Sequence, residues 1–109
     1  VLSSDGTLYL AEEQTARIRK IDASGIISLV AGTGEPGFTG DNGLATTAQL
    51  KRPFRMVFDK SGNLIFTDRD NNRIRKIDGK GSISTIAGHG NFGWMQDGLE
   101  VKITVHTFP

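Results

Sequence analysis

The sequence predicts an all-β fold built from two consecutive, similar sheets of four antiparallel strands each. Two observations predict it: the chain repeats itself at a fixed spacing, and its apolar runs are short and separated by turn signals. The six residues Arg17–Asp22 recur letter for letter as Arg73–Asp78, 56 positions later. At this offset 18 of the 53 aligned pairs are identical, and they are spread along the whole unit. We therefore divide the chain into unit 1 (residues 1–56) and unit 2 (residues 57–109), which are parts of one fold and not separate domains.

Each unit contains four expected strands in the same order. Turns such as Asp5-Gly6 and Ser24-Gly25 separate them, and the spacing of these turns excludes long helices. One short helix is expected at Ala45–Leu50, before Pro53 ends it. The expected strands are Val1–Leu2, Leu8–Ala11, Arg17–Ile21 and Ile26–Ala31 in unit 1, and Phe54–Phe58, Leu64–Thr67, Arg73–Ile77 and Ile83–Ala87 in unit 2.

The expected strands are apolar on both faces. Leu8–Leu10 and Leu64–Phe66 are unbroken apolar runs, whereas a sheet with one face in water alternates apolar and polar residues. Ile18 and Ile21 are three positions apart, so they point to opposite faces of their strand. Small four-stranded sheets that are covered on both faces by copies of themselves are the blades of a β-propeller. The side chains expected to pack between blades are Leu8, Leu10, Ile18, Ile21, Leu64, Phe66, Ile74 and Ile77.

The composition excludes several classes of protein. Lys and Arg number 13 against 12 Asp and Glu, and the net charge of +1 argues against a strongly basic nucleic-acid clamp. The apolar runs are far shorter than the roughly 18–20 residues that span a bilayer, so we expect no membrane partner. The absence of cysteine excludes disulfides and thiolate metal sites but leaves the compartment open. Because the chain begins with Val1, we expect it to be processed, excised or engineered.

Several strings of the sequence resemble NHL repeats. They are Asn71–Asp78, Ile83–Gly88, Gly34–Asp41 and the Pro-x-x-x-Val-x-Asp-x-x-Gly-Asn-Leu pattern of Pro53–Leu64. The resemblance covers essentially the whole chain, and it departs from the family pattern at Glu12–Ala16 and Trp94–His106. It implies a propeller of six blades, of which this chain supplies two.

A lone pair of blades would leave one apolar sheet face uncovered on each flank. Exposed apolar patches of several hundred Å² usually mark an interface. Three copies arranged head to tail would bury every flank and close a six-bladed ring. We therefore expect the chain to be its own partner in a homotrimer, and its function to be that of a non-catalytic scaffold or interaction module. A piece of a larger parent protein, and rings of four or eight blades, are the alternatives.

Three motifs resemble ligand sites but are better explained by the repeat. The glycines of Gly32–Gly37 match a dinucleotide fingerprint, but the residues that follow exclude the helix it requires. Asp68–Asn72 begins like a calcium loop but lacks the turn glycine and the twelfth-position Glu. His89 and His106 have no metal-ligand companion at close spacing. We expect no cofactor, no metal and no catalytic residue. The chain is therefore not expected to be an enzyme, although six-bladed relatives include lactonases and an amidating lyase.

Nucleic acid is a less favoured partner. Some NHL propellers bind single-stranded RNA, and here repeated arginines would meet phosphates while aromatic rings stack on bases. Acidic residues are interleaved with these arginines, however, so we expect the arginine stems to cover blade faces and to pair with nearby aspartates. The arginines are Arg17, Arg19, Arg73 and Arg75, and the aspartates are Asp22, Asp68 and Asp78.

The path of a four-stranded meander places the turn between its second and third strands on the same side as the long loop to the next blade. Loops of both units are therefore expected to share one face, where a protein or peptide ligand would bind. Phe38 and Trp94 occupy equivalent positions, which favours packing of each long loop onto its own blade. The loops are Glu12–Ala16, Asp68–Asn72, Gly32–Arg52 and Gly88–Phe108, and the expected ligand-binding residues are Phe38, Arg69, Asn72, Phe92 and Trp94.

Overall fold

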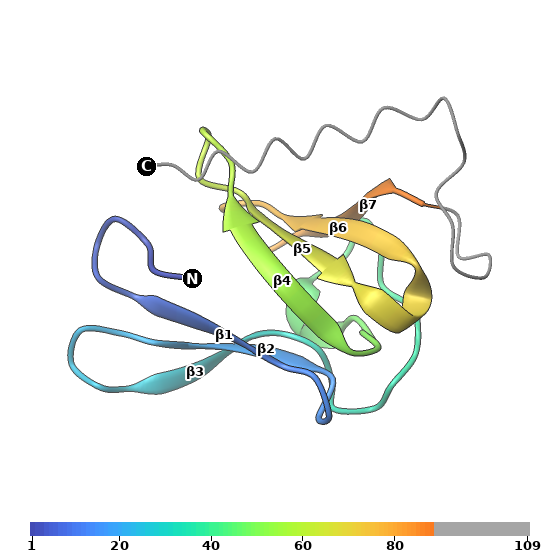
Figure 1. The fold of residues 1–109 in the computed structure, drawn as a ribbon, viewed down its shortest axis with the longest axis horizontal. Coiled ribbons are helices and arrows are strands. Elements are labelled where there is room, and N and C mark those ends of the chain that lie inside the picture. The colour runs from blue at the N-terminus through green and yellow to red at the C-terminus, as the bar shows by residue number, and fades with distance from the viewer. Residues whose placement is uncertain (89–109) are drawn as a thin grey trace.

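The computed structural model describes residues 1–88, which form two antiparallel β-sheets (Figure 1). The first sheet contains β1 (Leu8–Glu12), β2 (Arg17–Ile21) and β3 (Ile27–Ala31), in that order. The second contains β4 (Pro53–Phe58), β5 (Leu64–Asp68), β6 (Arg73–Ile77) and β7 (Ile83–Ala87), again in that order. Between the strands lie two single turns of 3-10 helix, η1 (Ala45–Thr47) and η2 (Arg69–Asn71). The predicted all-β fold of two blade-like meanders is confirmed. Within residues 1–88, no helix has the length and apolar character needed to cross a membrane.

The two sheets differ at their first strand. In the second sheet, β4 is the predicted edge strand and pairs with β5. In the first sheet, Val1 and Tyr9 exchange two backbone hydrogen bonds of 2.8 and 2.7 Å, and Leu2 forms a single bridge with Leu8. The segment predicted as the first strand of unit 1 thus lies beside β1, as β4 lies beside β5, but it is too short to form a strand.

The register of β1 and β2 assigns the side chains of the first sheet to two faces. In an antiparallel pair, directly opposed residues point to the same side. Ala11 is opposed by Ile18 and Leu8 by Ile21, so the two isoleucines lie on opposite faces, as predicted. We call the side with Tyr9, Ala11 and Ile18 the inner face, and the side with Leu2, Leu8, Leu10, Ile21, Ile27 and Leu29 around Arg19 the outer face.

The core lies between the inner face of the first sheet and the second sheet. Tyr9 meets Phe58 of β4 edge-on, with ring centres 5.1 Å apart. Buried side chains from both sheets and from the loop that joins them form one cluster, so this inter-blade loop is part of the core. The buried members are Ile18 and Ala31 from the first sheet, Ala45, Ala48 and Leu50 from the loop, and Leu64, Phe66, Ile77 and Ile83 from the second sheet.

Aspartates close the hairpin turns of both sheets. The carboxylate of Asp78 accepts hydrogen bonds from the backbone N–H groups of Lys80 and Ser82, at 2.9 and 3.0 Å. These bonds, the one from Ser82 above all, hold the pKa of Asp78 below its usual range. Asp22 and Asp59 accept the same pair of backbone bonds in their own turns. The same Asx turn therefore fixes three of the hairpins.

The inter-blade loop leaves β3 through Gly32, whose φ is +97°. The N–H of Gly32 donates to the carbonyl of Ala45 at 3.0 Å, which fixes the start of η1 against the end of β3. The helix expected at Ala45–Leu50 is only one 3-10 turn, because the backbone is already extended at Ala48. A Cβ on Gly32 would collide with the carbonyl oxygen of Ala16. Both the φ of this residue and its surroundings therefore require glycine.

Gly32→Ala is expected to lower the free energy of unfolding by more than the roughly 1–3 kcal/mol that backbone strain alone costs. The matched control is Gly25→Ala, because Gly25 has a similar φ of +86° but no atom within 4 Å of the position of an added Cβ. Urea denaturation at a fixed chain concentration measures both losses. Equal losses would show that the contact with the Ala16 carbonyl does not limit the substitution.

Candidate interaction surfaces

A buried arginine joins the second sheet to the inter-blade loop. Arg75 on β6 has no solvent exposure. Its Nη1 donates to the carbonyl of Gln49 at 2.8 Å and to the carboxylate of Asp68 at 3.0 Å. Its Nη2 donates to the carbonyl of Thr39 and to the carboxylate of Asp41, both at 3.0 Å. The guanidinium therefore orders the loop while two carboxylates neutralise its charge. We call Arg75, Asp68, Asp41 and the loop atoms that they bind the hub.

Asp68 is buried together with Arg75 and receives two further hydrogen bonds. The N–H of Lys51 donates to it at 2.7 Å, and the side-chain amide of Asn71 at 2.8 Å. The same amide donates to the carbonyl of Gly37 at 2.8 Å. Burial raises the pKa of Asp68, and the bonds from Asn71, Lys51 and Arg75 oppose this effect. One carboxylate thus connects η2, β6 and the end of the loop at Lys51.

Phe38 lies against the hub and not on its own blade. The guanidinium carbon of Arg73 is 3.5 Å from the centre of its ring, and that of Arg75 is 4.6 Å away. Such cation–π contacts stabilise the loop on β6. The expectation of packing onto the own blade is therefore wrong for Phe38, whose ring packs onto the following sheet because the arginines that bind it are there. Another part of the same loop, η1, lies against the end of β3 in its own blade.

The outer face of the first sheet carries the same apolar positions, and within residues 1–88 nothing covers them. Three of its side chains are exposed, while the residues that stand 56 positions later are buried. The pairs are Leu8 (39% exposed) with Leu64 (3%), Leu10 (37%) with Phe66 (1%), and Ile27 (56%) with Ile83 (0%). Leu2 and Leu29 of the outer face are exposed as well. The same face of the repeat is thus core in the second sheet and surface in the first, because the inter-blade loop and the inner face cover only the second.

The polar centre of the outer face is also open. Arg19 stands at the position of Arg75, and its Nε donates to the carboxylate of Glu12 at 3.1 Å. This bond is the main reason why the pKa of Glu12 lies below its usual range. The two side chains are 38% and 33% exposed, whereas Arg75 and Asp68 have no exposure. The outer face therefore has the ion pair of the hub but not the loop that surrounds it in the second sheet.

The residues predicted to pack between blades divide between these surfaces. Four belong to the core between the two sheets, and Ile74 is buried apart from that cluster. The four are Ile18, Leu64, Phe66 and Ile77. Leu8, Leu10 and the half-buried Ile21 lie on the outer face, so their packing against a further blade stays a prediction.

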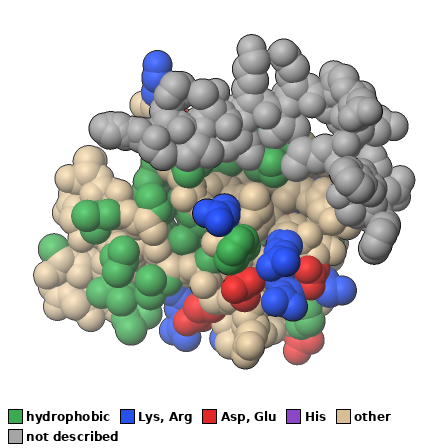
Figure 2. Space-filling model, viewed as in Figure 1, with side chains coloured by type: hydrophobic (Ala, Val, Ile, Leu, Met, Phe, Trp, Pro, Cys, Tyr) green, Lys and Arg blue, Asp and Glu red, His purple; other side chains and the backbone are tan. Residues whose placement is uncertain are grey.

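Loops of both units meet at one end of the molecule, where Figure 2 shows basic and acidic side chains gathered. The β1–β2 turn, η2 and the end of the inter-blade loop line a hollow of about 260 Å³. Within it, the guanidinium of Arg52 lies 3.9 Å from the carboxylate of Glu13 and 3.8 Å from that of Asp70. Such exposed pairs contribute little to stability. A charged ligand would therefore displace them at small cost.

Three of the five predicted ligand residues lie in the described part of the chain. Arg69 is exposed on η2, with its guanidinium carbon 5.4 Å from the ring centre of Phe54. Asn72 ends η2 in a left-handed conformation with φ of 54°. Phe38 lies at the hub, where its ring contacts Arg73, the residue after Asn72, and where the preceding Gly37 accepts a hydrogen bond from Asn71 of η2. Phe92 and Trp94 are outside the described residues.

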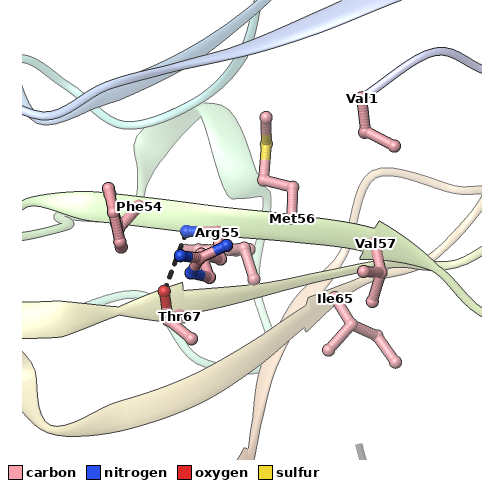
Figure 3. Close-up of a pocket in the computed structure, with 8 residues that line it drawn as sticks. Val1, Phe54, Arg55, Met56, Val57, Ile65 and Thr67 are labelled. Atoms are coloured by element: carbon pink, nitrogen blue, oxygen red, sulfur yellow. Dashed lines mark hydrogen bonds between the residues drawn. The ribbon is translucent and has the colours of Figure 1, made fainter. Parts of the chain in front are cut away.

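A groove of about 520 Å³ follows β4, which is an edge strand of the second sheet. Figure 3 shows Val1 and Met56 on one side of this strand and Val57 and Ile65 on the other. The exposed ring of Phe54 lies near its start and contacts the guanidinium of Arg55 at 5.1 Å. In the sequence, Phe54 begins an expected strand, and no motif marks it as a surface residue.

The ligand-like motifs have structural roles in the described residues. The two acids of the calcium-like motif Asp68–Asn72 are held apart, one in the hub and the other beside Arg52. No three acidic or histidine side chains within residues 1–88 are grouped to hold a metal. Gly32–Gly37 opens no helix. His89 and His106 lie outside the described residues.

Arg75→Met is expected to lower the free energy of unfolding by about 3–5 kcal/mol, because it leaves the carboxylate of Asp68 buried without its cation. Arg55→Met is the matched control, since Arg55 is exposed on the same sheet and its loss should cost less than about 1 kcal/mol. Urea denaturation at a fixed chain concentration measures both. A loss for Arg75→Met as small as that of the control would contradict a stabilising role for the hub.

The chain matches no protein-family model. Among curated proteins it is similar to teneurins. It is 36% identical to Teneurin-1 of Gallus gallus over 95 residues and 37% identical to Teneurin-4 of Homo sapiens over 89 residues. These alignments cover 75% and 70% of this chain but only 3% of each relative, so the chain spans a small part of the proteins it resembles.

Three solved structures show the same arrangement of strands. A protein of unknown function from Bacteroides thetaiotaomicron has a TM-score of 0.69 and 26% identity, covering 78% of this chain and 22% of that one. An auxiliary nutrient binding protein from Bacteroides ovatus has a TM-score of 0.60 and 25% identity, covering 76% and 23%. Virginiamycin B lyase from Staphylococcus aureus has a TM-score of 0.57 and 24% identity, covering 83% and 27%. All three are β-propeller-like, so the two sheets are arranged as propeller blades.

Proposed function

We propose that this chain is a pair of adjacent NHL-type propeller blades and works as a non-catalytic assembly module, which closes a ring with further copies of itself. One observation carries the proposal: the outer face of the first sheet is exposed, although the same face of the repeat is core in the second sheet. The strings that resemble NHL repeats, the similarity to teneurins and the propeller-like structures support the identity of the blades.

Covering the outer face is strongly favourable. Fully burying a leucine or isoleucine side chain stabilises a protein by about 1.5–3 kcal/mol, and six such side chains lie on this face. The chain itself contains a surface of the right kind. The inner face of the first sheet has an equivalent in the second sheet, which is the face that carries Ile65, Ile74 and Ile86.

Docking of the second sheet of one copy onto the first sheet of another repeats the contact already present within the chain. This docking joins two different surfaces. The copies therefore form a closed ring only when the rotations between neighbouring copies add up to a full turn. Three copies give six blades. The hollow beside Arg52 is lined by none of the outer-face side chains, so it would stay open for a protein or peptide ligand.

The mass of the folded particle tests the proposal. Light scattering on a sizing column should give about three times the chain mass of 11.8 kDa, with the far-ultraviolet circular dichroism of β-sheet. A well-folded particle with the mass of one chain at all accessible concentrations would contradict self-assembly.

Leu10→Asp tests the surface itself. It places a charge on a face that is exposed in the single chain, so it is expected to abolish assembly and leave a particle of one chain mass. Leu44→Glu is the matched control, because Leu44 is 58% exposed in the inter-blade loop and the repeat has Glu100 at the equivalent position. The control should assemble normally. Normal assembly of Leu10→Asp would mean that another surface joins the copies.

A further inference from the structure

We infer that residues 93–105 of one copy lie on the outer face of the next copy and complete around Arg19 the hub that Arg75 forms within the chain. This inference rests on the proposed function, since it names the segment that holds one copy on another. We call the contact of residues 93–105 with Arg19 of the next copy the lock.

The inter-blade loop shows which atoms such a segment must supply. Residues 37–49 give Arg75 two backbone carbonyls, those of Thr39 and Gln49, and the carbonyl of Gly37 accepts from the neighbouring Asn71. They also give Arg75 two side chains, the carboxylate of Asp41 and the ring of Phe38. Carbonyls are present whatever the sequence, so the two side chains are what the sequence must supply again for a segment that follows the same path.

Both side chains recur at the repeat spacing. Asp97 stands at the position of Asp41, and Trp94 stands at the position of Phe38. Gly93 also repeats Gly37 ahead of the aromatic residue. Most other positions of the segment differ between the units, including those of Thr39 and Gln49, whose contribution to the hub is backbone only. The segment 93–105 therefore keeps the chemistry that the hub uses and varies elsewhere.

On the outer face, Arg19 has fewer hydrogen-bond acceptors than Arg75 has in the hub. Within residues 1–88, its side chain donates one hydrogen bond, from Nε to Glu12. Burying its guanidinium under another blade requires acceptors for the remaining N–H groups. The carboxylate of Asp97 and two carbonyls of its segment meet that requirement, as their equivalents do at Arg75. Arg17, at the position of Arg73, is then placed to stack on Trp94 as Arg73 stacks on Phe38.

Asp97→Ala tests the lock without touching the described blades. It is expected to raise the concentration at which the particle dissociates by about tenfold or more, the effect of losing a hydrogen bond to a charged partner. Glu100→Ala is the matched control: it removes an acid from the same segment, but its equivalent Leu44 is exposed, and it should change the dissociation concentration less than about twofold. In an Arg19→Ala background, Asp97→Ala should have little further effect, because the two side chains act as one pair.

The single tryptophan of the chain provides a second measurement that does not depend on a variant folding well. When the assembled wild-type chain is diluted until it dissociates, the fluorescence emission of Trp94 should shift to longer wavelength as its ring leaves the neighbouring copy. Arg17→Ala should change the emission of the assembled form.

These outcomes separate the lock from the assembly. A wild-type chain that is a folded monomer overturns the proposed function and the lock together. Assembly in which Asp97→Ala behaves as Glu100→Ala does, or dissociation without a change in Trp94 emission, overturns the lock alone and leaves assembly through the apolar face in place.

Discussion

The burial of Arg75 is the constraint on which the arrangement of the two sheets depends. A guanidinium without solvent must be neutralised and hydrogen-bonded, and Asp68, Asp41 and carbonyls of the inter-blade loop do this. The loop cannot leave the second sheet without exposing or stranding that charge. It also carries Ala45 and Leu50 into the core, so polar and apolar interactions require the same arrangement. In the second sheet, the loop of the preceding blade thus completes the blade.

Much of the fold could be predicted from the sequence because it is encoded locally. The strands Arg17–Ile21 and Ile83–Ala87 have the predicted bounds, since Asx turns with glycine delimit them. The hub could not be predicted. Arg19 and Arg75 stand in identical hexamers, and their different burial depends on which loop lies above each sheet, which is a long-range property. Asp68 was expected to pair with one of the repeated arginines, and it does pair with Arg75, but nothing near either residue in the sequence indicates that the pair is buried.

Any neighbour that covers the outer face of the first sheet must supply two features. These are an apolar sheet surface and a loop that brings a carboxylate to Arg19. In the solved propeller-like proteins and the teneurins, the matched part is a small fraction of a longer chain. The present chain carries both features in its own second unit, in the face with Ile65 and in the segment with Asp97. A second copy is therefore the partner that we propose, with the internal contact between the sheets as the template for the contact between copies.

The central claim is that the outer face is covered in the assembled protein. Oxidation by hydroxyl radicals, followed by mass spectrometry, reports the solvent exposure of individual side chains. In the assembled particle, the account predicts that Leu10 and Ile27 are protected as strongly as the buried Phe66 and Ile83, while Leu44 stays reactive. Oxidation of Leu10 and Ile27 at a rate like that of Leu44 in that particle would contradict it.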